Sequence, residues 1–432
     1  GWSATKTFTI KNDTKTEYKY NIVIKDLLNT FVTNGYLQYK ITSTNNGYNM
    51  TEFKDIPKSS TPKDKVLAYS VVIPNGITQS YTIEFKYTND ESVDQSDDMG
   101  RKLSGTLFIT EGTEQPTLLT QLLADKSTVL TRTDFSKVLT NDNTKTLYTS
   151  TENGTTVYYF AGNATDNWVK FGKNASNQDL YWRIIRTNSD GSIRLLYHGT
   201  STTATDAYIG KSEFNEKWND PMYEGYMYGT SNSAAIDRSN TNNSTIKTTI
   251  DNWYISNLEA KDYTKYLSRT AVYCNDRTYT VSEYAYFGAL TRLETNKTPT
   301  YDCAITEDKF TADTSTGNGK LDHPIALMTA DEVSFAGGLL TTNAPTWYYN
   351  SVNGSSTGDE DWWLLSPSYW EGSGALVFSV GGSSYPGRLG VNYVYGTGGV
   401  RPAISLKSCT LYSTGNGSAS DPYTIKETET GC

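Results

Sequence analysis

Consecutive acidic side chains near the C-terminal third of the chain are the first candidates for chemistry. Asp359, Glu360 and Asp361 stand in a row, and pairs of carboxylates catalyse glycoside hydrolysis when they flank the scissile bond. Consecutive residues rarely face one another, so we interpret this run as a solvated acidic turn. Trp362 and Trp363 follow it and could stack on a sugar, although at least one is expected in the core.

Other catalytic signals are sparse. The chain has two histidines, His198 and His323, and neither a Gly-x-Ser-x-Gly elbow nor a phosphate-binding loop. The string Trp218-Asn219-Asp220 matches a calcium and sugar motif of calcium-dependent lectins. However, Pro221 follows it, it lies far before the expected C-terminal position, and its usual partner motif is missing. We therefore predict no enzyme, no catalytic residue, no cofactor and no metal site.

Four cysteines, Cys274, Cys303, Cys409 and Cys432, indicate disulfides. A small even number in an apparently extracellular chain is typical of structural bridges, and three pairings are possible. Pairing of nearest neighbours, Cys274–Cys303 and Cys409–Cys432, is the favoured one. None of the four has CxxC spacing, so a zinc site is not expected.

The composition favours β-rich extracellular modules. Aromatic residues make up 13% of the 432 residues, including 33 Tyr, and only 20% are charged, which argues against disorder. The net charge of −9 and the lack of a Lys/Arg cluster exclude nucleic acid as a partner. No apolar run approaches the roughly 20 residues that span a bilayer. We expect an exported, cell-surface protein whose signal or anchor is absent from this sequence.

The hydrophobic pattern divides the chain into domains. Residues 1–112 contain short segments of alternating polarity, such as 18–24 and 81–87, which predict an antiparallel, Ig-like β-sandwich. Four leucines at helical spacing predict a short helix in a connector over residues 113–150. Residues 151–432 form the second predicted domain, which again contains many strand-like segments. The predicted class is therefore β-rich α+β.

Several short motifs of the second domain occur together in a recognisable order. They are Val169–Phe171, Tyr181–Arg186, Gly225–Gly229, Ser244–Lys247, Asp251–Tyr254, Cys274–Arg277, Ile325–Val333, Trp362–Pro367 and Gly399–Leu406. In this order they resemble a domain of surface and secreted proteins of Gram-positive gut bacteria. That family is similar to the C-type lectin fold, to formylglycine-generating enzymes and to the variable proteins of diversity-generating retroelements. The resemblance covers about residues 145–425 and implies a C-type-lectin-like domain with an elaborated insert over about 200–345.

The same resemblance implies that the segment before Gly399 faces a ligand. Residues 368–397 contain seven Gly, five Ser and four Tyr, a composition that resembles antibody paratopes. These residue types also arise from an asparagine codon when adenines change, as in diversity-generating retroelements. The predicted ligand-facing positions are Tyr369, Trp370, Ser373, Ser379, Ser383, Tyr385, Arg388, Asn392, Tyr393 and Tyr395. The predicted fixed scaffold between them is Ala375, Leu376, Val377, Phe378, Val380, Val391 and Val394.

Three functions stay open at this point. The favoured one is capture of a protein or glycan ligand by a variable surface near residues 368–397. A fixed glycine-rich region in a structural or pilus-type subunit is the first alternative, and Trp370 and Glu371 fit a variable asparagine codon poorly. A formylglycine-generating-like enzyme is the second alternative. Against it, Cys409 and Cys432 are placed to form a structural disulfide across a terminal hairpin with its turn at 415–417.

Overall fold

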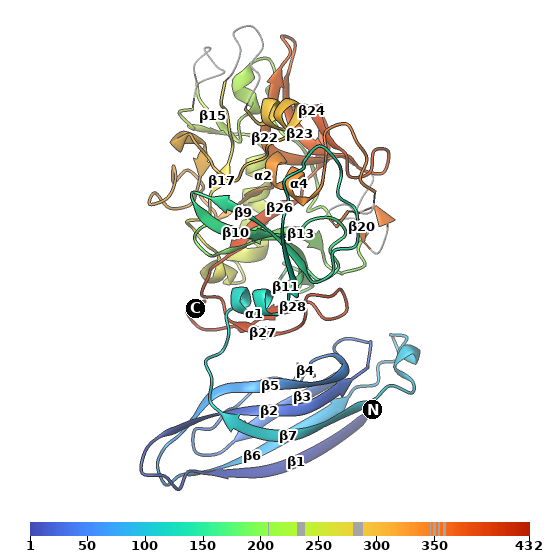
Figure 1. Ribbon diagram of the computed structural model, residues 1–432, viewed down its shortest axis with the longest axis vertical. Helices are drawn as coiled ribbons and strands as arrows, with labels where there is room; N and C mark the ends of the chain where they lie inside the picture. The colour runs from blue at the N-terminus through green and yellow to red at the C-terminus, as the bar shows by residue number, and fades with distance from the viewer. Residues whose placement is uncertain are drawn as a thin grey trace. The chain divides into compact units, whose positions relative to one another are not determined.

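The computed structural model describes residues 1–205, 207–230, 238–279, 288–345, 347–348, 351–352, 355–356 and 360–432. It contains 40% strand and 13% helix in several antiparallel sheets, which confirms the β-rich class. The chain divides into two compact units, Gly1–Pro116 and Thr117–Cys432 (Figure 1).

The first unit contains two sheets that share one core. Its strands are β1 (Trp2–Lys11), β2 (Tyr18–Asn29), β3 (Leu37–Ser43), β4 (Lys54–Asp55), β5 (Ser59–Ile73), β6 (Thr78–Tyr87) and β7 (Leu103–Glu111), with a short helix η1 (Ser96–Asp98). The strand orders are β1-β6-β3-β4 and β5-β2-β7, and the pairs are antiparallel. Alternating residues such as Ile22, Ile41 and Ile83 are completely or almost completely buried between them, because successive side chains of a strand point to opposite faces.

The largest sheet of the second unit has ten strands. They are β8 (Thr128–Thr131), β9 (Thr146–Glu152), β10 (Thr155–Tyr159), β11 (Trp168–Lys173), β12 (Asp179–Thr187), β13 (Ile193–Gly199), β19 (Ile325–Leu327), β26 (Pro402–Leu406), β27 (Tyr412–Thr414) and β28 (Tyr423–Ile425). The main path is β19-β26-β13-β12-β10-β9-β8. Strand β28, close to the end of the chain, pairs in parallel with β11. The sheet therefore combines strands from the beginning and from the end of the unit's sequence.

A five-stranded sheet carries the predicted ligand-facing segment. Its order is β14 (Lys211–Glu213), β25 (Thr397–Gly399), β22 (Trp362–Trp370), β23 (Ala375–Val380) and β24 (Leu389–Tyr393). Strands β22, β23 and β24 follow one another as an antiparallel meander. In Figure 1 they lie side by side at the end of the second unit remote from α1 and β27.

Helices and short strand pairs complete the second unit. The helices are α1 (Leu118–Ala124), η2 (Pro221–Glu224), α2 (Thr245–Tyr254), η4 (Ile255–Glu259), η5 (Tyr263–Tyr266), α3 (Gly288–Leu290), η6 (Thr291–Asn296), η7 (Thr306–Asp308) and α4 (Ala330–Ala336). The short strands are β15 (Met227–Tyr228) with β16 (Asn242–Asn243), β17 (Tyr273–Cys274) with β18 (Lys309–Phe310), and β20 (Ser351–Val352) with β21 (Ser355–Ser356). The predicted insert, 200–345, contains α2, α3, α4 and strands of only two or three residues.

Capping residues explain where α2 begins and where α4 begins and ends. Ser244 accepts a hydrogen bond from the Lys247 amide and starts α2. Thr329 and Glu332 form a reciprocal capping box at the start of α4. Gly337, with φ of 117°, ends α4 in the left-handed conformation that glycine adopts without strain.

The unit boundary lies after Pro116. The range 113–150, expected as a connector, contains α1 as its helix, but it also contains β8 and the start of β9. Because β8 pairs with β9 at the edge of the ten-stranded sheet, this stretch is part of the second unit.

Two disulfides link the four cysteines as predicted, Cys274 with Cys303 and Cys409 with Cys432. The second pair flanks the antiparallel strands β27 and β28, with Gly415 and Gly417 in the turn region at positive φ. Two disulfides indicate an oxidising environment. In the part of the chain that the structure describes, no helix has the length and apolar character to cross a membrane.

Candidate functional site

The apolar frame of the predicted ligand-facing segment lies inside the protein. Ala375, Val377, Phe378 and Val380 of β23 are completely buried, and Leu376 retains 4% of its surface. Val394 is also buried, while Val391 is partly buried against the same core. Strand β23 is covered on both faces and paired on both edges, so its side chains cannot reach solvent. The frame is therefore rigid.

Nine of the ten predicted ligand-facing side chains reach solvent. Four are exposed, namely Ser373, Ser383, Tyr385 and Tyr395. Five are half-buried, namely Tyr369, Trp370, Arg388, Asn392 and Tyr393. Apart from Asn392, whose amide donates to Asp361 and to the buried Ser379, these polar and aromatic residues thus extend outward from an apolar layer.

Ser379 is the exception, and its prediction as a ligand-facing residue is wrong. It lies in the middle of β23 and only 1% of its surface is exposed. The Asn392 amide donates to its hydroxyl over 3.1 Å. Ser379 is buried because it alternates with Phe378 and Val380 in a strand that is covered on both faces.

Eight of these nine predicted residues fall into two groups at opposite ends of the meander, and Asn392 lies apart from both within β24. One group lies where β22 and β24 end, and its predicted members are Tyr369, Trp370, Ser373, Tyr393 and Tyr395. Together with their neighbours Trp218 and Glu371, we call it the aromatic end. The other group, Ser383, Tyr385 and Arg388, lies in the loop between β23 and β24. The six residues of β23 separate the groups by roughly 17 Å at about 3.3 Å per residue. The single patch expected from the sequence is thus divided in two.

Aromatic rings cluster tightly at the aromatic end. The rings of Tyr393 and Tyr395 stack with centroids 5.2 Å apart, and Trp218 meets Tyr395 edge-on at 5.7 Å. Tyr393 lies flat against the backbone at Gly374, where a Cβ atom would stand 2.8 Å from its ring. Tyr369 and Tyr393 both lie opposite Leu376 on neighbouring strands. These contacts hold the rings in place before any ligand binds.

Glu371 supplies a carboxylate beside these rings. Its Oε1 accepts hydrogen bonds from the Tyr393 hydroxyl and from the Ser373 hydroxyl. The hydrogen bond to Glu371, together with partial desolvation, raises the pKa of Tyr393 above its ordinary value. Among the described residues Glu371 forms no ion pair with Lys or Arg. A negative group therefore stays available next to an aromatic surface.

Trp218 and Glu371 are the members of the aromatic end that the sequence did not predict, and Trp218 comes from a distant part of the chain. Its carbonyl accepts the Ala375 amide at 3.0 Å, which fixes the 214–218 segment to the tip of the β22–β23 hairpin. Asp220 of the lectin-like string accepts from the Met222 amide and caps η2. Because Trp218 is far from Tyr395 in the sequence, no local pattern predicts that their rings are in contact.

The loop between β23 and β24 makes a smaller surface. The Arg388 guanidinium lies 3.7 Å from the centre of the Tyr385 ring, and Tyr385 is 48% exposed. Asn392 of β24 lies next to this loop, and its amide donates to Asp361 and Ser379. Asp361 also accepts from the Gly382 amide. The carboxylate therefore shapes the loop.

The acidic run and the tryptophan pair have structural partners. Glu360 pairs with Lys211 at 2.6 Å, Asp361 binds the β23–β24 loop, and Asp359 lies outside the described residues. Trp362 and Trp363 each keep 1% of their surface exposed, so both belong to the core. Of the described residues in this run, Glu360 and Asp361 are therefore engaged in contacts within the fold.

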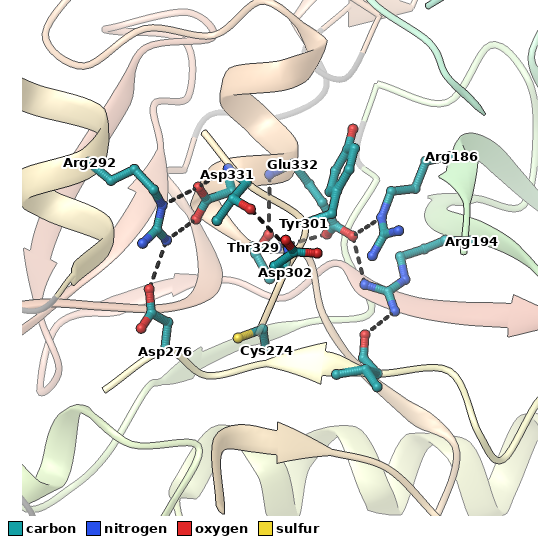
Figure 2. A pocket seen from close by; sticks show the side chains of 12 residues that line it. Arg186, Arg194, Cys274, Asp276, Arg292, Tyr301, Asp302, Thr329, Asp331 and Glu332 are labelled. Carbon is teal, nitrogen blue, oxygen red and sulfur yellow. Dashed lines mark hydrogen bonds and ion pairs between the residues drawn. The ribbon is translucent and has the colours of Figure 1, made fainter. Parts of the chain in front are cut away.

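A second concentration of charged side chains is buried around Glu332, at the start of α4 (Figure 2). Glu332 Oε1 accepts from Arg186 at 2.8 Å and from Arg194 at 2.6 Å, while Oε2 accepts from the Thr329 amide. Arg186 also pairs with Glu152 at 2.8 Å. None of these four charged side chains exposes more than 5% of its surface. Burial alone would raise the pKa of Glu332, but Arg194 and Arg186 outweigh it and lower that pKa.

The neighbouring residue Asp331 forms a second set of ion pairs, through Arg292. Arg292 binds both carboxylate oxygens of Asp331 and also contacts Asp276 at 2.7 Å. Burial raises the pKa of Asp331 despite the opposing effect of Arg292. We call the combined set the Glu332 cluster: Glu152, Arg186, Arg194, Asp276, Arg292, Asp331 and Glu332.

The space inside the Glu332 cluster is too small for a substrate. The cavity between its side chains measures about 10 Å³, which is room for a single water molecule. A larger cavity of about 160 Å³ lies beside it, lined by Tyr301, Cys303, Asp190 and neighbouring polar residues. Carboxylate and guanidinium groups in the cluster are paired with each other, so its arrangement serves to join α4 to β12 and β13.

Comparison with protein-family models, with curated proteins and with solved structures found no match to this chain. Within the described ranges, no group of His, Cys, Asp or Glu is arranged to hold a metal ion. The geometry of the two regions is therefore the basis for a functional proposal.

Proposed function

We propose that this chain is a non-enzymatic ligand-binding protein of a bacterial cell surface, of the receptor or adhesin kind. In this proposal the second unit is a C-type-lectin-like domain whose aromatic end, and to a lesser extent the β23–β24 loop, contacts a protein or glycan. The first unit is an Ig-like module that supports the binding unit. The oxidising environment indicated by the disulfides is consistent with that location.

A single observation carries the proposal: an apolar, buried frame presents outward aromatic and small polar side chains. Tyr395 is 46% exposed and Tyr385 is 48% exposed, although both belong to a segment whose apolar residues are buried. Tyrosine and tryptophan supply large contact areas with few torsions to order on binding. Burial of the tyrosines, or their scatter over separate faces, would have favoured a structural subunit. Three of the four predicted tyrosines, Tyr369, Tyr393 and Tyr395, gather at the aromatic end, whereas Tyr385 lies in the β23–β24 loop.

The diversification of this surface by a retroelement remains part of the proposal. Positions such as Ser373, Tyr393 and Tyr395 could vary without disturbing the buried frame, because their side chains extend from turns and strand ends. Sequencing of the DNA beside the gene tests this part. A near-copy of the segment that differs only at adenines, next to a reverse-transcriptase gene, is the expected finding, and its absence would contradict diversification.

Array binding tests the main proposal. The wild-type chain is applied to glycan and protein arrays beside the variant Tyr393→Ala, with thermal unfolding to verify that the variant folds. We expect at least one ligand that wild type captures and the variant loses by roughly tenfold or more, as when a central aromatic contact is removed. A ligand bound equally by both proteins would place recognition elsewhere.

A further inference from the structure

We propose that the aromatic end binds an arginine side chain of a protein partner, whose guanidinium stacks on the tyrosine and tryptophan rings beside the Glu371 carboxylate. This inference rests on the proposed function and names the chemistry of the ligand at that site.

The aromatic half of this site is ordered and accessible. The rings of Tyr393 and Tyr395 are stacked, and Trp218 stands edge-on to Tyr395. Tyr395 exposes 46% of its surface and Trp218 exposes 43%. The face of an aromatic ring carries partial negative charge and attracts cations. A cation that approaches this surface therefore meets rings that need no rearrangement.

The carboxylate half is held toward the same surface. Glu371 is oriented by hydrogen bonds from Tyr393 and Ser373, and no Lys or Arg among the described residues neutralises it. By contrast, Glu360 is paired with Lys211, and Glu332 is paired with two arginines. The net charge of −9 also attracts basic partners over long range.

Arginine is favoured over other cations because aromatic rings and a carboxylate occur together at the site. A guanidinium is planar, stacks on rings and can bind a carboxylate with two hydrogen bonds at once. The protein itself uses this contact repeatedly. Arg388 lies over Tyr385 at 3.7 Å, Arg183 over Trp168 at 4.0 Å, and Arg401 over Trp362 at 4.7 Å.

Two matched peptides test the inference with the full chain. One is a glycine-rich peptide that carries arginine, and the other carries citrulline, which has the same shape without the charge. Dissociation constants are measured by ligand-observed NMR titration at low ionic strength. We expect the arginine peptide to bind about five- to tenfold more tightly, the combined effect of an exposed cation–π contact and a surface ion pair.

Variants separate the site from general charge effects. Glu371→Gln is expected to weaken the arginine peptide about threefold to fivefold and to leave the citrulline peptide unchanged. Tyr395→Leu is expected to weaken both peptides, because it removes stacking area. Glu259→Gln removes an exposed carboxylate at the end of η4 and serves as the matched control, with no change expected.

Several results would overturn the inference. These are equal dissociation constants for the two peptides, no binding of either at millimolar concentration, or equal weakening by Glu371→Gln and Glu259→Gln. Capture of a neutral glycan that Tyr393→Ala abolishes, without arginine binding, would leave the proposed function standing and remove this inference alone. If no array ligand depends on Tyr393 either, both proposals fall.

Discussion

The Glu332 cluster and the aromatic end belong to the same unit, yet they handle their functional groups in opposite ways. In the cluster, carboxylates and guanidinium groups are buried or partly buried and form ion pairs with one another, with about 10 Å³ of space between them. At the aromatic end, rings and a carboxylate are held by neighbours but left open to solvent. The charged side chains of the cluster thus stabilise the fold, whereas the exposed rings and the carboxylate of the aromatic end are the groups that we propose contact a ligand.

The difference shows why residue type alone misleads about function. Seven charged residues in the cluster would attract attention as an active site, but each of them forms at least one ion pair with another member. Breaking a buried pair costs more than the pair contributes relative to an apolar core. The predictions below therefore separate effects on stability from effects on binding.

The largest expected effect is on the stability of the cluster. Glu332→Gln leaves Arg186 and Arg194 without their shared charge partner, and we expect a loss of about 3–5 kcal/mol in the free energy of unfolding of the second unit. Chemical denaturation measures it. Glu371→Gln is the matched control at the aromatic end, where no change in the midpoint is expected. Similar unfolding midpoints for the two variants would contradict the claim that Glu332 stabilises the fold and Glu371 does not.

The disulfide beside the cluster is expected to contribute nearly as much. Cys274 and Cys303 close a loop with a sequence separation of 29, and removal of such a crosslink costs about 3 kcal/mol. The double variant Cys274→Ser and Cys303→Ser should lower the unfolding midpoint while array binding at the aromatic end persists. Loss of binding in a variant that is still folded would couple the two regions, against our account.

Acid should weaken the cluster in a defined direction. The pKa values of Glu332 and Glu152 are lowered in the folded state, because arginines outweigh burial. Their stabilisation is therefore complete above the ordinary value of 4.5 and is lost as the pH falls through the folded pKa. Unfolding midpoints measured between pH 7 and pH 3 should fall less steeply for Glu332→Gln. Parallel curves for variant and wild type would contradict this assignment.

Ser379 provides a smaller test of the buried frame. Ser379→Ala removes the acceptor of the Asn392 amide, and a loss of about 1 kcal/mol in unfolding free energy is expected, with unchanged ligand capture. Reduced capture, at unchanged stability, would return Ser379 to the ligand-facing set.

Among the variants expected to change stability, the smallest effect is expected at Tyr395. Tyr395→Leu keeps an apolar contact with Trp218 at a site that is 46% exposed, so unfolding free energy should change by less than about 0.5 kcal/mol. Binding should nevertheless weaken, which the arrays measure in parallel. A large stability loss would make Tyr395 part of the core.

Local sequence patterns predicted many of the strands and helices, but few of the contacts between residues far apart in the chain. The period-two segments and the favoured pairing of neighbouring cysteines follow from residues that are close in sequence, and the family resemblance implied the frame around Phe378. The meeting of Trp218 with Tyr395, and of Glu332 with Arg186, joins residues far apart in the chain. Ser379 was misjudged because burial of both faces of β23 depends on what covers the strand, which alternation alone does not reveal.

Hydrogen exchange with a ligand recovered from the arrays tests the central claim most directly. Amide exchange is compared by mass spectrometry with and without the ligand, over the segments of the aromatic end and of the Glu332 cluster. Our account predicts slower exchange on binding in residues 369–375 and 393–396, with no change in 329–336. Protection confined to 329–336 and the polar cavity beside Tyr301 would contradict it.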